Sequence, residues 1–232
     1  MNRHWVVKVN MQIEQQLDEI KNKVADALKL AVAKGATGAE ASMSRVEGIA
    51  VSARLGEVEN VEFTNDGGLG ISVYVGQRKG SASTADLSQE ALRTAVEKAV
   101  EIAKYTSEDP CAGLADKELI AEEIPDCDLY HPIELDTEKG LALALETEQH
   151  ALQFDERITN SDGASYNANL GLRVYGNTHG LIAGFPSSRY SLSCVTIGEQ
   201  DGDMQRDYSY SVDRKFDQLA DPKTIGEEAA SF

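Results

Sequence analysis

Hydrophobic residues recur at steps of three and four in the first part of the chain. They are Ile13, Leu17, Ile20, Val24, Leu28 and Ala31. This spacing gathers apolar side chains on one face of an α-helix. Gly35 follows the last turn, where a helix C-cap favours a residue that tolerates a left-handed backbone. The pattern therefore predicts an amphipathic helix over 13–34.

The period changes to two after Gly35, as expected for half-buried β-strands. We predict strands over 39–46, 49–55, 58–63, 69–75 and 78–84. Glu47-Gly48 would form the first hairpin tip, and Asn65-Asp-Gly-Gly68 a second turn. This part of the chain is thus predicted to be a helix followed by an antiparallel meander.

The same order of helix and strands returns in the second half. Ser88 can cap a helix over 89–105, and a further helix is predicted over 137–154, with Gly140 as its weak point. Strand patterns then follow, separated by the turn-forming segments 160–163, 176–180 and 199–202. The predicted strands are 157–159, 164–167, 170–175, 181–185, 188–197 and 204–212. We expect an α+β fold of two helix-plus-antiparallel-meander subdomains, with a strand-rich second half.

The segment 106–132 separates these two halves. It holds three of the five prolines, many acidic residues and little periodicity, which is typical of a linker. We therefore predict five parts along the chain. They are an extension at 1–12, a first α+β subdomain at 13–105, a linker at 106–132, a sheet-rich subdomain at 133–220, and at 221–232 the start of a helix or a linker toward a further C-terminal domain.

One short sequence occurs twice. Leu69-Gly-Ile-Ser-Val-Tyr74 and Leu170-Gly-Leu-Arg-Val-Tyr175 share four of six residues, and a predicted helix precedes each. A duplicated helix-plus-meander unit would explain this similarity. Two strands that merely share common strand residues would explain it equally well.

The charge excludes some partners. The 39 acidic and 22 basic residues give a net charge of −17, which repels phosphate backbones and argues against nucleic acid. No apolar run approaches the roughly 20 residues that span a bilayer, and the first nine residues are too polar for a signal peptide. Three widely spaced cysteines without a CxxC pair are typical of reduced thiols. We expect a cytoplasmic protein with no nucleic-acid or membrane partner.

Candidate metal ligands are sparse. None of His4, His131, His150 and His179 lies three or four residues from another, and no H-E-x-x-H motif occurs. The densest cluster is Asp126-Cys-Asp-Leu-Tyr-His-Pro-Ile-Glu134, which offers three carboxylates, a thiol and an imidazole. Metal ligation there competes with a solvated acidic linker in which His131-Pro132 sets a turn. The linker is the preferred interpretation, so we assign no metal ligand.

The candidates for covalent or cofactor chemistry are equally weak. Serines 187, 188, 191 and 193 lie in a strand pattern without a G-x-S-x-G elbow. Cys194 is expected to pack as a small hydrophobe. Gly67-Gly-Leu-Gly70 lacks phosphate-loop spacing and fits a hairpin turn better. Tyr208 and Tyr210 share one sheet face, where core or interface packing is preferred over a ligand platform. We therefore assign no catalytic or cofactor-binding residue.

Several longer stretches resemble the PmbA/TldD family, and within it the TldE/PmbA type. The resemblance covers the chain from about Ile13 to its end. The stretches are 57–63 (EVENVEF), 66–71 (DGGLGI), 78–83 (RKGSAS), 105–113 (YTSEDPCAG), 115–119 (ADKEL) and 202–208 (GDMQRDY).

The resemblance implies a cytoplasmic bacterial metalloprotease system in which TldD-type and TldE-type chains pair as a heterodimer. Such pairs degrade or trim flexible peptides, including a microcin precursor and an antitoxin linked to DNA gyrase. The family's zinc lies in the TldD-type chain, on an H-E-x-x-x-H helix beyond the N-terminal domains. This sequence has no such motif, so no family catalytic residue carries over to it. The older family name, modulator of DNA gyrase, does not indicate DNA binding by a chain of this charge.

Two functions follow as expectations. In the first, the chain is the non-zinc subunit fragment of this peptidase system, and its partners are a TldD-like subunit and flexible peptides. It would hold no cofactor itself, since the zinc is expected in the partner. In the second, it is a stand-alone peptide-binding or scaffold module without a proteolytic role. An exposed sheet edge that accepts extended peptides would suit either function.

Overall fold

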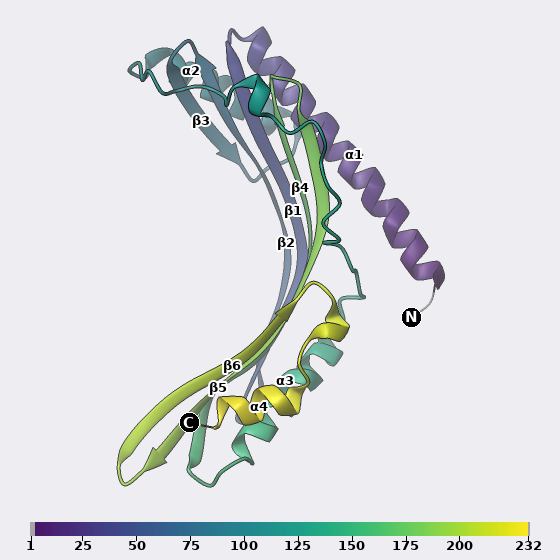
Figure 1. Cartoon of the computed structure of the whole chain (residues 1–232), viewed down its shortest axis with the longest axis vertical. Coiled ribbons are helices and arrows are strands. Elements are labelled where there is room, and N and C mark those ends of the chain that lie inside the picture. Colours follow the sequence, from purple (N-terminus) through teal and green to yellow (C-terminus); the bar gives the residue numbers. More distant parts are fainter. Residues whose placement is uncertain (1–2, 232) are drawn as a thin grey trace. The chain divides into compact units, whose positions relative to one another are not determined.

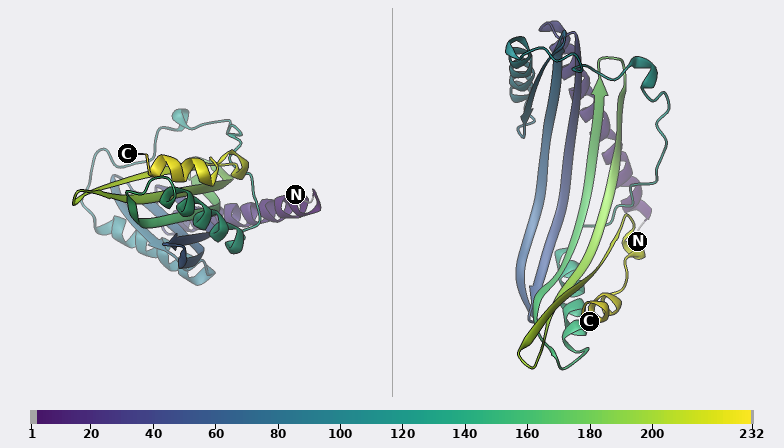
Figure 2. Two further views of the ribbon diagram at one scale, coloured as in Figure 1. Left: turned by 90° about the horizontal axis from the view of Figure 1, so that it is seen from below. Right: turned by 60° about the vertical axis from the view of Figure 1, so that its left-hand side comes forward.

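The computed structural model describes the backbone of residues 3–231 and the side chains of residues 12–231. Six strands form one antiparallel sheet in the order β3-β2-β1-β4-β5-β6 (Figures 1 and 2). Along the chain, the helix-plus-meander order predicted from the sequence occurs twice, so the α+β prediction is confirmed. The elements are α1 (Arg3–Ala33), β1 (Gly38–Arg54), β2 (Glu57–Val75), β3 (Arg78–Thr84), α2 (Gln89–Tyr105), α3 (Thr137–Leu152), β4 (Ile158–Asn177), β5 (Ile182–Gln200), β6 (Asp203–Asp213) and α4 (Pro222–Ala229), with short 3-10 turns η1 (Lys117–Leu119) and η2 (Phe216–Gln218).

Helices α2 and α3 begin and end close to the predicted positions, whereas α1 begins ten residues before its predicted start at residue 13. Helix α2 has the predicted bounds, and the Ser88 hydroxyl accepts a hydrogen bond from the N–H of Ala91 as its N-cap. Helix α3 is capped in the same way by Asp136. Gly35 follows α1 with a φ of 101°, as its cap position requires. Helix α1 starts at Arg3, so residues 3–12 of the predicted extension are its first turns, while Met1 and Asn2 lie outside the described residues.

The strands are longer than predicted, and the two turns predicted within the first half of the chain are wrong. Strand β1 continues through Glu47-Gly48, and β2 continues through Asn65–Gly68. In β1 the alternation keeps its phase across the glycine, because Ala39, Ala41 and Met43 are buried before it and Ile49, Val51 and Ala53 after it. Gly48 is needed for close approach instead: a Cβ there would lie 2.3 Å from Oδ1 of Asn169 on β4.

The same error occurs in the second half. Strands β4 and β5 join segments predicted as separate strands, and the predicted turn at 160–163 lies inside β4. The turns predicted at 176–180 and 199–202 do connect strands. The β1–β2 turn is at Leu55-Gly56, where both residues have positive φ, as a two-residue hairpin needs. Leucine rarely adopts this conformation, so the pattern did not reveal it.

The chain forms two compact units, each assembled from three segments. Unit 1 comprises residues 1–46, 66–127 and 171–186, and unit 2 comprises residues 47–65, 128–170 and 187–232. The long strands contribute residues to both units, which is why neither unit is a continuous stretch of sequence. The division into a first subdomain at 13–105, a linker at 106–132 and a second subdomain at 133–220 stays a prediction.

Unit 1 has its core between one sheet face and helices α1 and α2. Val24, Ala31, Met43, Val73 and Val96 are all fully buried in this core. Its other sheet face is not part of this core, and we call it the open face of unit 1. By the β2–β3 register it carries Gly70, Ser72 and Tyr74 opposite Ser83, Ser81 and Lys79.

Unit 2 has its core between one sheet face and the helices α3 and α4, which pack on each other. The ring of Phe216 makes edge contacts with Tyr166 and Tyr190, both at 6.1 Å between centroids. Close packing again relies on glycine, since a Cβ on Gly226 of α4 would lie 2.4 Å from the carbonyl oxygen of Thr147 on α3. No helix within residues 3–231 combines the length and the apolar character needed to cross a bilayer.

Candidate functional site

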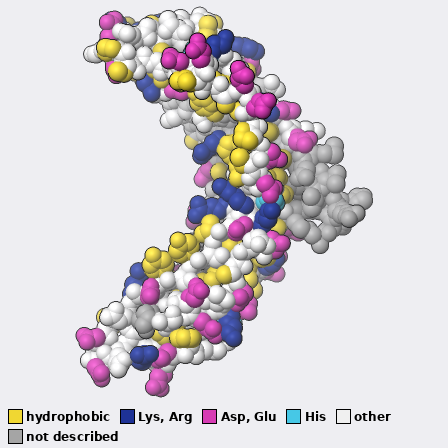
Figure 3. Space-filling model, in the orientation of Figure 1, with side chains coloured by type: hydrophobic (Ala, Val, Ile, Leu, Met, Phe, Trp, Pro, Cys, Tyr) yellow, Lys and Arg dark blue, Asp and Glu magenta, His cyan; other side chains and the backbone are white. Residues whose placement is uncertain are grey.

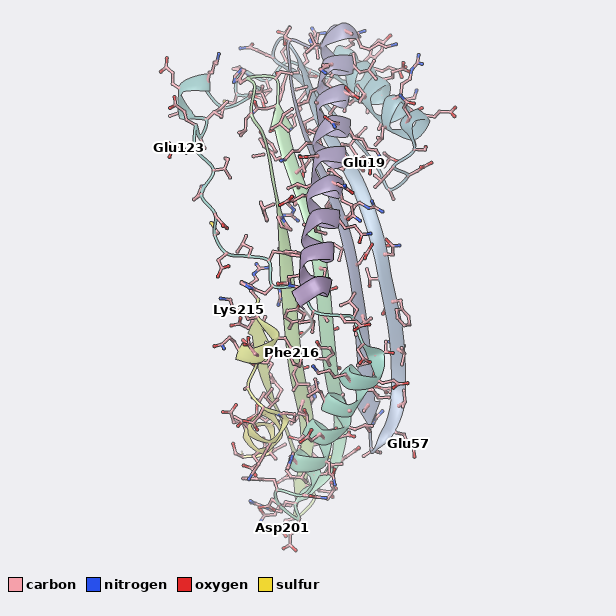
Figure 4. The ribbon with its side chains drawn as sticks, turned by 90° about the vertical axis from the view of Figure 1, so that its right-hand side faces the viewer. Glu19, Glu57, Glu123, Asp201, Lys215 and Phe216 are labelled. Carbon is pink, nitrogen blue, oxygen red and sulfur yellow. The ribbon has the colours of Figure 1, made fainter. Side chains whose placement is uncertain are left out.

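The acidic segment that the sequence offered as a metal cluster is attached to unit 2 by structural contacts. The carboxylate of Asp128 lies 3.1 Å from Nζ of Lys215, which is labelled in Figure 4, and 3.2 Å from Nε2 of His131. The hydrogen bond from Lys215 is the main cause that lowers the pKa of Asp128. Within residues 12–231, no three His, Cys, Asp or Glu side chains gather closely enough to hold a metal ion. Asp128 therefore contacts both Lys215 and His131, and the absence of a metal ligand in this segment stays a prediction.

Ser188 and Tyr190 of β5 hold the same segment in place. The Ser188 hydroxyl accepts from the N–H of His131 at 2.9 Å and donates to the carbonyl of Arg214 at 2.7 Å. The Tyr190 hydroxyl donates to the carbonyl of His131 at 2.8 Å and accepts from the N–H of Ile133 at 3.2 Å. Ser188 is buried. Its hydroxyl is therefore hydrogen-bonded to the backbone on both sides.

Cys194 packs in the core of unit 2, as the sequence predicted. It is fully buried, and burial raises the pKa of its thiol to about 12, with the nearby Glu148 as a smaller cause. Cys111 and Cys127 are exposed. The three thiols should therefore differ strongly in reactivity.

This difference predicts the order of alkylation. Burial raises the pKa of Cys194 to about 12, so the thiol is almost entirely protonated at pH 8, and its full burial keeps the reagent away from it. We expect iodoacetamide to label Cys111 and Cys127 in the native protein, and Cys194 only after denaturation. Peptide mass spectrometry of the labelled chain measures this. Labelling of Cys194 at the rate of Cys127 would contradict the packing described here.

The most exposed aromatic cluster lies on β6, at the edge of the sheet. Tyr208 is 60% and Tyr210 is 63% exposed, and their rings stack at 6.2 Å with an interplanar angle of 14°. Met204 and Val212 are also exposed and share their strand face. We call these four residues the tyrosine patch. The sequence placed Tyr208 and Tyr210 on one face correctly. Of the two alternatives that it preferred, core packing is wrong because both residues are exposed, and interface packing stays a prediction.

The backbone beside the patch is partly protected against strand pairing. Within the part of the chain that the structure describes, β6 pairs only with β5, with Tyr208 opposite Val195 and Tyr210 opposite Ser193. The N–H of Tyr208 donates to the carboxylate of its neighbour Asp207 at 2.8 Å. Arg206 is held by Asp162 of β4 at 2.7 Å. Charged groups at an edge strand discourage indiscriminate association, which leaves the side-chain face as the accessible feature. Figure 3 shows hydrophobic side chains in groups on the surface.

A second surface lies on the open face of unit 1. Its middle carries only small polar side chains, and the hydroxyls of Ser72 and Ser81 are 2.9 Å apart. The result is a shallow cavity of about 460 Å³, which we call the serine groove. One end is formed by Glu40 and Tyr175. Sequence reasoning missed this surface, although serines at every second strand position were its signal. The small lining residues on this face are Ser42, Gly70, Ser72, Ser81 and Ser83.

Comparison with sequence families gives two matches in chain order. Residues 39–103 match domain 1 of the PmbA/TldA metallopeptidases, and residues 130–232 match the central domain of the same family.

Two curated relatives cover nearly the whole chain. A metalloprotease PmbA homolog from Haemophilus influenzae is 53% identical over 218 residues, which are 94% of this chain and 48% of the relative. Metalloprotease PmbA from Escherichia coli O157:H7 is 50% identical over 224 residues, 97% of this chain and 50% of the relative. The chain thus spans about half the length of the relatives it matches.

Solved structures share the fold. A Bacteroides thetaiotaomicron protein described as a candidate modulator of DNA gyrase superposes with a TM-score of 0.84 at 25% identity, over 92% of this chain and 49% of that one. TldE from Thermococcus kodakarensis superposes with a TM-score of 0.67 at 16% identity, over 90% of this chain and 46% of that one. At that identity the second likeness shows the fold alone.

Proposed function

The chain belongs to the PmbA/TldD family, and from this premise we propose that it is part of the non-zinc, TldE/PmbA-like subunit of a cytoplasmic metalloprotease system. The system degrades or matures flexible peptides. The catalytic zinc belongs to a TldD-like partner, with which this subunit forms a heterodimer. This chain contributes no cofactor and no catalytic group, and its task is to restrain the peptide.

The placement of the side chains that could bind zinc supports a role for this chain without zinc chemistry. Catalytic zinc needs about three protein ligands that converge on one point, with an open position for water. The described side chains contain no such convergence, and the sequence has neither an H-E-x-x-H nor an H-E-x-x-x-H motif. This supports the proposal that the zinc lies outside these residues, in a TldD-like partner.

The tyrosine patch is the observation that carries the peptide-binding part of the proposal. Stacked, exposed rings with apolar neighbours provide contact area for peptide side chains at little cost in conformational entropy. Contacts of this kind do not read a particular sequence. They therefore suit flexible substrates of varied sequence.

A stand-alone peptide-binding module is the second candidate. The tyrosine patch lies on one strand of one unit, so peptide contact at this surface needs no second subunit. The two functions differ in whether bound peptide is processed when a zinc-bearing partner is added.

Reconstitution with a TldD-type partner tests the proposal. A fluorogenic flexible peptide would be incubated with the partner alone, with this chain alone, and with both. We expect cleavage only with both. Loss of the two rings in Tyr208→Ser/Tyr210→Ser should lower kcat/KM about tenfold, mainly through KM, because the lost contacts hold the peptide.

The matched control is Tyr105→Ser, which removes another highly exposed tyrosine from the other unit and should leave cleavage unchanged. Equal cleavage by the double variant and the unsubstituted chain would contradict peptide contact at the patch. Peptide binding without processing in the presence of a competent partner would favour the stand-alone module.

A further inference from the structure

Glu40 on β1 is held by two tyrosines from the neighbouring strands. The Tyr74 hydroxyl on β2 donates to its Oε1 at 3.0 Å, and the Tyr175 hydroxyl on β4 donates to its Oε2 at 3.0 Å. β1 lies between β2 and β4 in the sheet. The two tyrosines are the last residues of the two similar six-residue segments found in the sequence. The repeated segments therefore converge on one carboxylate.

The charge of this carboxylate is not matched by a cation. Among residues 12–231, no Lys, Arg or His nitrogen lies within ion-pair distance of Glu40. The phenolic hydroxyls are neutral donors. Burial and the hydrogen bond to Glu40 raise the pKa of Tyr74 to about 12, so it remains a donor at neutral pH. A negative charge thus remains at the end of the serine groove, oriented by two fixed partners.

The surroundings suit an ammonium group. Tyr74 is almost buried, whereas Tyr175 is 37% exposed and also borders the groove. Nζ of Lys79 already lies 5.7 Å from the centroid of the Tyr74 ring. Tyrosine faces attract cations, and ring and carboxylate together satisfy an alkylammonium group better than either alone. The overall charge of −17 also favours a cationic ligand.

Lysine fits the geometry better than arginine. A guanidinium binds a carboxylate best with two parallel hydrogen bonds, one to each oxygen. In Glu40 each oxygen already accepts a tyrosine hydroxyl. An ammonium group is a compact point charge and can approach the remaining lone pairs from one side. The exposed Tyr175 ring offers a surface for the methylene stem of a lysine side chain. The terminal amine of a peptide has no such stem.

We propose that Glu40, Tyr74 and Tyr175 form a binding site for the lysine side chain of an extended peptide whose backbone lies over the serine groove. The groove can take a chain close to the sheet because, apart from Glu40, the residues that line it on the open face of β1, β2 and β3 are serines and Gly70. A Cβ placed on Gly70 would meet no atom within 4 Å, so this position is open. The serine hydroxyls can donate to and accept from peptide groups. The inference rests on the proposed function only in taking a peptide as the carrier of the lysine.

A binding assay with the chain alone tests this site. The probe is a fluorescein-labelled, N-acetylated, extended peptide with one central lysine, compared with otherwise identical peptides that carry norleucine, acetyl-lysine or arginine. A norleucine peptide with a free N-terminus completes the set. By fluorescence anisotropy we expect the lysine peptide to bind about tenfold more tightly than the norleucine and acetyl-lysine peptides, as one charged contact implies. The preference should shrink at high salt.

Variants of the chain identify the site. Glu40→Gln should remove the preference for lysine over norleucine, while Tyr175→Phe, which keeps the ring, should reduce it only in part. Glu57→Gln is the matched control, because it removes the same charge from an exposed position of unit 2 (Figure 4). Circular dichroism separates binding from folding. The comparison of lysine with acetyl-lysine on the unsubstituted chain needs no variant at all.

Three results would overturn the inference. They are equal affinity for lysine and norleucine peptides, an undiminished lysine preference in a folded Glu40→Gln, and a free N-terminus or an arginine bound as tightly as lysine. The assay contains no zinc-bearing partner and no cleavage step. Its failure would therefore leave the cleavage prediction standing, and a failed reconstitution would leave this site standing.

Discussion

Gly80→Ala is expected to destabilise the protein by about 3 kcal/mol, near the upper end for an overpacked core position. Gly80 lies on β3 where α2 crosses it. A Cβ there would lie 2.1 Å from the carbonyl oxygen of Ala99 and 2.4 Å from the amide nitrogen of Ala103. Both atoms belong to the backbone of α2, so no side-chain rotation relieves the clash. The helix would have to move away from the sheet and lose contacts in the core of unit 1.

The free energy of unfolding from urea denaturation measures this effect. Gly70→Ala on the paired strand β2 is the matched control, because its Cβ would meet nothing within 4 Å and its φ is not positive. We expect the control to be neutral or slightly stabilising, because alanine restricts the unfolded chain. If both variants lost the same stability, the close approach of α2 to β3 would be contradicted.

Glu148→Ala is the second substitution with a large expected effect, about 2–3 kcal/mol. Glu148 of α3 is 1% exposed, and its carboxylate accepts the N–H groups of Leu55 at 2.8 Å and Gly56 at 2.9 Å. Both residues have positive φ, so their successive N–H groups form a small anion-binding concavity at the β1–β2 turn. Removal of the carboxylate leaves two donors without their partner and a void beside the helix.

Two further variants separate these causes. Glu148→Gln keeps the volume of the side chain but places an amide group toward two donors. It should therefore destabilise the protein by more than half as much as Glu148→Ala does. Glu146→Ala changes an exposed glutamate on the same helix and should cost less than about 0.5 kcal/mol. Thermal and urea denaturation report both. An isostable Glu148→Ala would show that the hairpin turn does not depend on this carboxylate.

Local sequence signals predicted the helices well and the strand breaks poorly. Helix α2 has the bounds predicted from its cap and its apolar stripe, because both signals are local. Glu47-Gly48 and Asn65–Gly68 have turn composition, yet they lie within strands. Their glycines are required by close packing against residues that are distant in sequence. Gly48 lies close to Asn169, and Gly67 lies close to Leu87. Composition alone does not distinguish a glycine required by a turn from one required by close packing.

The tyrosine patch and the serine groove could not be predicted without the order of the strands in the sheet, which the sequence left open. Alternation placed Tyr208 and Tyr210 on one face, but only the position of β6 at the sheet edge shows that this face is exposed. Tyr74 and Tyr175 are 101 positions apart and meet at Glu40 because β1 lies between β2 and β4. The similarity of their two segments was visible in the sequence. The sequence did not show that both tyrosines donate to the same carboxylate.

The zinc content of the chain on its own tests the central claim most directly. The purified chain would be treated with a mild chelator, its zinc measured by elemental analysis, and the same sample assayed for peptide cleavage without a partner. A chain with 39 acidic residues, most of them exposed, binds divalent ions loosely, so only zinc that survives chelation counts. The account predicts substoichiometric zinc and no cleavage. One chelation-resistant zinc per chain, together with cleavage by this chain alone, would contradict it.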